Sequence, residues 1–259
     1  MKNKEYRIQD TDLISLSAKR SVSETVCQQS GLSGEAGLPT IVGITGGIGS
    51  GKSTIARELS QRGFAVYDCD REAKRIIAEN KDVQAAIIRL LGPEAFREVP
   101  SDQVPSTKVY NTAYVAQRVF DDAHLLTELN AIIHPAVKAD ICQRAKRAVC
   151  QQSGLSVKRS VSKAVLFIES AILFEAGLDT ICDKIIVIEA PEEVRIARTI
   201  ERDYGGVATE ENINKVRARM RAQKSPAPEK TQGKYYRVAN DGRLVLSRVV
   251  NLICDIATR

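Results

Sequence analysis

The sequence lacks several residue types and patterns that would point to other classes of protein. Its 259 residues include no tryptophan and only two histidines, and none of the six cysteines forms a Cys-x-x-Cys pair. A histidine-rich or cysteine-rich metal site is therefore not expected, and the cysteines are interpreted as reduced, buried thiols. No apolar run is long enough to cross a bilayer. We expect a cytoplasmic protein without a membrane partner.

Other absences concern the charge pattern and the N-terminus. The net charge of +6 favours an anionic partner only in general terms. The basic stretches lack the regular interleaving of aromatic residues that would stack on bases, so no nucleic-acid partner is expected. Residues 1–38 carry five carboxylates and no continuous apolar segment, which argues against a signal peptide. The oligomeric state is not encoded in any visible pattern, and a monomer is the favoured expectation.

The chain divides into a polar N-terminal part and a patterned remainder. Residues 1–38 are rich in Ser, Gln and Gly and are expected to form a flexible extension. The heptapeptide at 27–33 recurs letter for letter at 150–156. Two copies do not make a repeat architecture. We interpret them as inserted filler, with a small interaction motif as the alternative.

Residues 39–259 alternate short apolar runs with helical periodicity, the pattern of an α/β domain. Such alternation predicts a doubly wound parallel sheet with helices on both faces. A proline-rich stretch at 93–105 is expected to be a loop, and Pro135 is expected to break or kink a helical block at 114–149. The expected strands are 41–44, 64–67, 164–168, 184–188 and 236–239.

The strongest motif is a glycine-rich loop between the first expected strand and the first expected helix. Residues 46–53 read GGIGSGKS and match the P-loop pattern GxxxxGK[ST]. Backbone N–H groups of such a loop surround phosphate oxygens. Lys52 would reach the β- and γ-phosphates, and the Ser53 hydroxyl would bind Mg²⁺. The predicted ATP-binding residues here are Gly47, Ile48, Gly49, Ser50, Gly51, Lys52, Ser53 and Thr54.

The features of other P-loop classes are incomplete. A small GTPase needs Asn-Lys-x-Asp to read guanine, but the nearest match, at 80–83, ends in valine. Glu169 follows an expected strand and could be offered as the acid of a motor ATPase. It lacks a companion aspartate, and the chain is short for a motor. Kinase features are present instead.

Two carboxylates follow the second expected strand. Asp68 and Asp70 lie at the carboxyl end of that strand, where parallel sheets bind their ligands. Either could accept the proton of an attacking hydroxyl or help to hold Mg²⁺ through water. The alternative is a helix N-cap, for which aspartate is well suited. Asp70 is the preferred catalytic candidate.

Three arginines suggest a lid. Arg195, Arg198 and Arg202 recur at helical spacing and are followed by a glycine pair and a second basic helix. Guanidinium groups can bind phosphate oxygens bidentately. A solvated helix face is the alternative interpretation, but in a P-loop protein the pattern favours a mobile lid.

Taken together, these motifs resemble the dephospho-coenzyme A kinase family. The resemblance runs from about residue 41 to the C-terminus. It rests on the loop at 43–54, the Asp-x-Asp pair, Ile133-His134-Pro135, the segment ILFE at 172–175 and Asn240-Asp241-Gly242. It implies a P-loop core with a helical acceptor insertion at about 71–149 and a lid at about 195–224.

The resemblance also implies an activity. The reaction would be ATP-dependent phosphorylation of the ribose 3′-hydroxyl of dephospho-CoA, with Mg²⁺ as cofactor. Asp70, Lys52 and Arg198 would be catalytic, and Arg198 and Asn240 would contact ATP. The acceptor would be bound by Asp68, Asp70, His134 and Glu175, although a core or helix-capping role for His134 stays open. Alternatives are a kinase for another small nucleotide or nucleoside, and an interaction protein that uses nucleotide as a switch.

Overall fold

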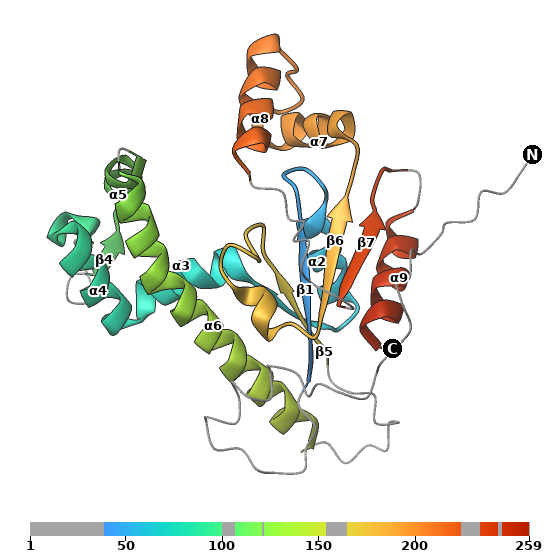
Figure 1. Ribbon diagram of the computed structural model, residues 1–259, viewed down its shortest axis with the longest axis horizontal. Helices are drawn as coiled ribbons and strands as arrows, with labels where there is room; N and C mark the ends of the chain where they lie inside the picture. The colour runs from blue at the N-terminus through green and yellow to red at the C-terminus, as the bar shows by residue number, and fades with distance from the viewer. Residues whose placement is uncertain are drawn as a thin grey trace, which may run out of the picture.

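The computed structural model describes residues 39–99, 107–120, 122–153, 165–223, 234–242 and 245–258. The extension expected at 1–38 lies outside these ranges, as do the last three residues of the second heptapeptide copy, whose first four residues continue a helix. The centre of the molecule is a five-stranded sheet with the order β2-β5-β1-β6-β7, in which every pair is parallel (Figure 1). Its strands are β1 (Thr40–Gly46), β2 (Ala65–Asp68), β5 (Val165–Glu169), β6 (Lys184–Glu189) and β7 (Tyr235–Ala239).

Each face of the sheet has its own hydrophobic core, as expected for a sheet covered on both sides. Along β1, Val42 and Ile44 face α2 (Lys52–Gln61) and α9 (Leu246–Thr258), and Ile41 belongs to the opposite core. That second core extends into the helices on the other side of the sheet. The doubly wound α/β fold expected from the sequence is confirmed.

The region between β2 and β5 differs from two expectations. The helix expected over the whole of 71–91 is divided into α3 (Cys69–Glu79) and α4 (Lys81–Leu91), because the Asn80 side chain caps α4 by accepting from the backbone N–H groups of Asp82 and Val83. The loop expected at 93–105 was wrong in part. It contains a 3-10 turn (Pro93–Ala95) and β3 (Phe96–Val99), which pairs with β4 (Thr107–Tyr110) in an antiparallel hairpin.

The helical block expected at 114–149 does not break at Pro135. The chain forms α5 (Thr112–Phe120) and then α6 (Ala123–Ser153), which continues through Pro135. The boundary lies instead at Asp122, whose carboxylate accepts from the N–H groups at the start of α6. Proline removes one helical hydrogen bond, but buried side chains on both sides of it, Leu129 and Val137, keep the helix on the core.

Two further helices project beyond the carboxyl ends of β1 and β6 (Figure 1). These are α7 (Glu192–Tyr204) and α8 (Glu210–Ala222), and they pack on each other through their own small cluster of Ile196, Ile200 and Val216. The contact with the rest of the fold is therefore made mainly by polar groups at the sheet edge. None of the described helices is long and apolar enough to cross a membrane.

Candidate active site

The phosphate loop joins β1 to α2 at the carboxyl edge of the sheet. Lys52 begins α2, and its ammonium group donates to the carbonyl oxygens of Gly46 at 2.8 Å and Gly47 at 3.1 Å. Burial lowers the pKa of Lys52, opposed by the charge of Glu169 and reinforced by Arg195. The lysine is thus held inside the glycine-rich loop at 46–53 by contacts with the loop's own backbone.

Two glycines of the loop are required by close contacts. Gly49 and Gly51 have φ values of 77° and 95°, in the region that side chains disfavour. A Cβ on Gly49 would meet the backbone of Arg195, and one on Gly51 would meet the amide of Asn240. The loop is therefore enclosed by groups from the C-terminal third of the chain as well as shaped by its own sequence.

Four side chains from this later part of the chain hold the loop. The Nε of Arg195 donates to the carbonyl of Ile48 at 2.8 Å. Arg198 donates to the carbonyl of Ser50 at 3.4 Å, and Asn240 donates to the same oxygen at 2.8 Å. Gln223, the fourth, accepts from the Ile48 N–H at 2.8 Å.

These contacts test the expected arginine stripe. Arg198 and Asn240 lie at the loop, where the sequence placed them, and Arg198 also donates to the Asn240 carbonyl at 2.9 Å. The contacts that Arg195 and Gln223 make with the loop itself were not expected from the sequence. Arg202 pairs with Asp203, with a 2.6 Å contact between its Nε and the carboxylate.

An acidic edge faces the loop from the neighbouring strands. Asp68 ends β2 and pairs in register with Glu169, the last residue of β5. Asp68 caps α3 by accepting from the Arg71 N–H at 3.0 Å, so the capping alternative holds for this residue. Asp70 lies exposed in the first turn of α3.

Glu169 is the acid that sequence reasoning set aside. Its carboxylate accepts from the Ser53 hydroxyl at 3.3 Å. Burial and the charges of Asp68 and Asp70 raise the pKa of Glu169, while Lys52 opposes the shift. Its position after a buried strand beside β1 was the available signal. Strongly perturbed groups at a sheet edge are typical of functional sites.

The two other predicted acceptor residues lie on separate elements. His134 is half-buried in α6, and burial lowers its pKa. Glu175 is exposed in the turn that follows β5. Among the described residues, no hydrogen bond or ion pair links either of them to the phosphate loop. The structure therefore brings Lys52, Ser53, Asp68 and Asp70 to one edge of the sheet, and His134 and Glu175 lie on α6 and on the turn after β5.

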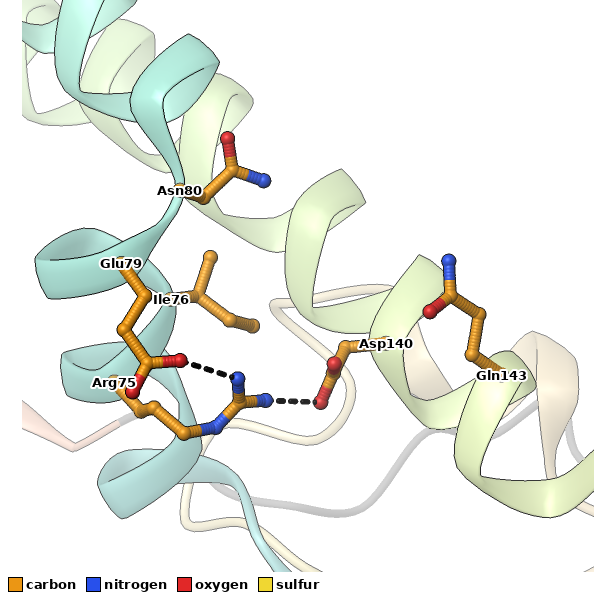
Figure 2. Close-up of a pocket in the computed structure, with 6 residues that line it drawn as sticks. All are labelled: Arg75, Ile76, Glu79, Asn80, Asp140 and Gln143. Atoms are coloured by element: carbon orange, nitrogen blue, oxygen red, sulfur yellow. Dashed lines mark hydrogen bonds and ion pairs between the residues drawn. The ribbon is translucent and has the colours of Figure 1, made fainter. Parts of the chain in front are cut away.

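A polar cluster connects α3 to α6 next to this edge. Glu72, with only 5% of its side chain exposed, accepts from Arg75 at 2.6 Å and from Arg144 at 3.0 Å. Arg75 also lies between Glu79 and Asp140, as Figure 2 shows, at 3.1 Å and 2.7 Å. The residues around it line a cavity of about 260 Å³ between the two helices. The helix that carries Asp70 is thereby fixed to α6.

Comparisons with known proteins agree with this geometry. A family model for dephospho-CoA kinase matches residues 40–245. The dephospho-CoA kinase of Chlorobaculum tepidum is 37% identical over 210 residues, which is 81% of this chain and 90% of that protein. That of Salinibacter ruber is 37% identical over 205 residues, 79% of this chain and 90% of the relative.

Solved structures are similar in fold. The crystal structure of TT1252 from Thermus thermophilus has a TM-score of 0.59 and 30% identity and covers 85% of this chain and 98% of its own. The dephospho-CoA kinase from Campylobacter jejuni has a TM-score of 0.52 at 19% identity, covering 84% of this chain and 96% of its own. The second likeness is one of fold alone.

Proposed function

This chain belongs to the dephospho-CoA kinase family, and from that premise we propose how its residues carry out the reaction: transfer of the terminal phosphoryl group of ATP to the ribose 3′-hydroxyl of dephospho-CoA, the last step of coenzyme A biosynthesis. The observation that carries the proposal is the meeting of a phosphate loop with an exposed carboxylate at one sheet edge. Lys52 and Asp70 are close enough there for the charge of Asp70 to act on the pKa of Lys52.

In the proposed reaction, Asp70 and Lys52 at this edge have different roles. The 3′-oxygen attacks the γ-phosphorus, the bond from that phosphorus to the β,γ-bridging oxygen breaks, and ADP leaves. Asp70 accepts the proton of the 3′-hydroxyl, since a carboxylate in the first turn of α3 can face an acceptor held against the acidic edge. Lys52 neutralises charge that develops on the transferring group.

Arg198 supports the same step from α7. Both of its contacts, to Ser50 and to Asn240, use Nη1. A guanidinium carries five N–H donors in a planar fork, so the same side chain can hold the loop and contact ATP phosphates. Asn240 fixes the loop from the end of β7 through the Ser50 carbonyl.

The residues present fit Mg²⁺ bound together with ATP. The Ser53 hydroxyl and the Glu169 carboxylate lie 3.3 Å apart, and burial, followed by the charges of Asp68 and Asp70, raises the pKa of Glu169. A divalent cation at this edge would favour the ionised carboxylate. No group of three or more metal-ligating side chains occurs in the described ranges. That suits a cation that takes most of its ligands from phosphates and water. When bound, Mg²⁺ would neutralise phosphate charge.

The acceptor side and the lid are assigned by position. We place the acceptor between α3, α6 and the turn after β5, where Asp68, His134 and Glu175 would contribute, and we assign the lid to α7 and α8. Four described cysteines are free thiols, which is compatible with the cytoplasm as the site of action.

An acceptor screen tests the activity. The protein is mixed with ATP, Mg²⁺ and a panel of acceptors, and ADP release is followed with a coupled assay. Rapid release with dephospho-CoA alone is expected. Rapid release with a different nucleotide or nucleoside would contradict the substrate, and slow hydrolysis that ignores every acceptor would favour a nucleotide switch.

A binding measurement tests the metal assignment separately. We expect Glu169→Gln to weaken Mg²⁺-dependent tightening of ADP binding, measured by calorimetry with and without Mg²⁺. The matched control is Glu189→Gln, which changes an exposed carboxylate at the end of β6. Equal Mg²⁺ dependence in the wild type and Glu169→Gln would remove Glu169 from the metal site.

A further inference from the structure

The side chain of Gln223 joins three segments that are far apart in the sequence. Its Oε1 accepts from the Ile48 N–H at 2.8 Å, within the phosphate loop. Its Nε2 donates to the Gly46 carbonyl at 3.4 Å and to the Ala171 carbonyl at 3.3 Å. One amide group therefore connects the end of α8 to the loop and to the turn that follows β5.

The backbone conformation of Gln223 allows its side chain to reach the loop. Gln223 is the C-cap of α8, and its φ and ψ of −73° and 120° are extended rather than helical. Its N–H still bonds to the Arg219 carbonyl, so the residue remains attached to the helix. Both ends of the side-chain amide are used, the acceptor on an N–H and the donor on two carbonyls, which matches the full polar character of a glutamine.

The Gly46 carbonyl is a second partner of Gln223, and we expect its own set of donors to change when ATP binds. In this structure the carbonyl accepts from the Lys52 ammonium at 2.8 Å as well as from Gln223 at 3.4 Å. In the proposed reaction Lys52 moves to the ATP phosphates, and the buried carbonyl loses its shorter contact. A buried carbonyl left without a donor is costly. Gln223 is the neighbouring donor, so ATP binding should draw its amide closer to the loop.

The Nε2 of Gln223 also contacts the turn that follows β5, on the proposed acceptor side. Ala171 is the first residue of the turn 171–177 that carries Glu175, and the preceding Ser170 is fixed to the sheet by its N–H bond to Ile44. A shift of the Gln223 amide toward Gly46 therefore changes its contact with this turn. The geometry points to Gln223 as a positioning residue that couples ATP binding to acceptor binding. The inference rests on the proposed function, and coupling of this kind is reciprocal.

Equilibrium binding tests the coupling directly. The Kd of dephospho-CoA is measured by calorimetry with and without a non-hydrolysable ATP analogue and Mg²⁺. In the wild type we expect the analogue to tighten acceptor binding by about fivefold or more, within the range usual for coupled sites. In Gln223→Ala the ratio should fall below about twofold. A residue that served only to hold α8 in place would leave this ratio unchanged.

Two further variants separate coupling from loss of structure. Gln223→Glu keeps an acceptor for the Ile48 N–H but has no donor for Gly46 or Ala171, so it should lose the coupling as well. Thr209→Ala removes the side-chain cap at the other end of α8, where Thr209 accepts from the Asn212 N–H at 3.2 Å. It loosens the same helix without touching the loop and should retain the wild-type ratio. Thermal unfolding of each variant verifies that the fold is intact.

The outcomes distinguish this inference from the proposed function. If the wild type neither binds nor phosphorylates dephospho-CoA, the proposed function fails and the inference fails with it. If the wild type is active but Gln223→Ala and Gln223→Glu keep the coupling, the inference alone is wrong. Tighter ATP binding in Gln223→Ala would also overturn it, because the glutamine would then occupy the place of a phosphate oxygen.

Discussion

Two arms flank the phosphate loop, and in each a carboxylate is bound by arginines from both of the arm's helices. In the acceptor arm, formed by α3 and α6, Glu72 binds Arg75 and Arg144 at 2.6 Å and 3.0 Å. In the lid arm, formed by α7 and α8, Asp203 binds Arg202 and Arg219, both at 2.6 Å. The distances are alike, but the surroundings differ.

Burial separates the two carboxylates. The Glu72 side chain is 5% exposed and that of Asp203 is 24% exposed. Burial raises the pKa of Glu72, but the hydrogen bonds from Arg75 and Arg144 outweigh it and leave the pKa below its usual value. The pKa of Asp203 is held well below its usual range mainly by its hydrogen bonds from Arg202 and Arg219.

The difference suits what the two arms would do. Separating α3 from α6 would break the bond from Arg144 and expose a buried carboxylate, so we expect the acceptor arm to keep the helix of Asp70 in place. Exposed ion pairs contribute little and are weakened by salt. We therefore propose that the lid arm is the part that can move over the loop at low cost.

The largest expected effect is at the loop that both arms face. Lys52→Ala should lower turnover by about 10³- to 10⁵-fold, the effect of removing one cation from a transferring phosphoryl group. Steady-state ADP release with dephospho-CoA measures it. Lys81→Ala, an exposed lysine at the start of α4, is the control and should stay at the wild-type rate. Comparable rates for both variants would reject the loop assignment.

The next effect belongs to the acceptor arm. Asp70→Asn should lower turnover by about 10²- to 10⁴-fold, the range for losing a general base, with little change in ATP affinity. Asp68→Asn is the matched variant, because asparagine caps a helix as well as aspartate does and only the charge is lost. A loss ten times larger in Asp68→Asn would exchange the two roles.

The phosphate loop and the sheet could be predicted from the sequence because their signals are local. The motif at 46–53 lies between an apolar run and an amphipathic helix, and both elements are found where they were expected. The capping function of Asp68 was among the alternatives for the same reason. A residue that acts within a few positions of its own strand or helix can be read from its neighbours.

Contacts over long sequence separations could not be predicted. Gln223 reaches Ile48 across 175 residues, and Arg195 reaches the same residue across 147. Glu72 and Arg144 are 72 residues apart. In each case the pairing depends on how the helices pack, which no periodicity in the chain encodes. The continuous helix through Pro135 has the same origin, since tertiary packing there overrides a local preference.

The third prediction concerns the contribution of Glu72 to stability, which we expect to exceed that of Asp203. Glu72→Gln should lower the free energy of unfolding by about 1–3 kcal/mol, because a charged acceptor is lost beneath two arginines. Those arginines are 38% and 45% exposed, so water offsets part of the loss and the low end is expected. Because the folded-state pKa of Glu72 is lowered, its contribution is present above its unfolded pKa and is lost as the pH falls through the folded value.

Urea unfolding at neutral pH and again at acidic pH measures the Glu72 contribution. Glu79→Gln is the matched control, since Glu79 binds the same Arg75 but is 64% exposed. We expect its effect to be below about 0.5 kcal/mol. If the two variants lose the same stability, burial does not distinguish these carboxylates, and the rigid acceptor arm would have to be abandoned.

The smallest effect is expected in the lid arm. Asp203→Asn should cost no more than about 1 kcal/mol, because the arginine partners are 59% and 48% exposed and well solvated. The lowered pKa of Asp203 means that its contribution to stability is complete above its unfolded pKa and disappears as the pH falls through the folded value.

Amide hydrogen exchange in α7 and α8 is the suitable measurement, because the opening of a lid need not change global unfolding. In the wild type, 1 M salt should speed exchange in these helices toward the rate of Asp203→Asn, and the variant itself should respond little to salt. Glu211→Gln is the control, since Glu211 pairs with Lys215 within α8 and not between the helices. Exchange in the wild type that ignores salt, or an equal effect from Glu211→Gln, would show that Asp203 does not hold the lid arm together.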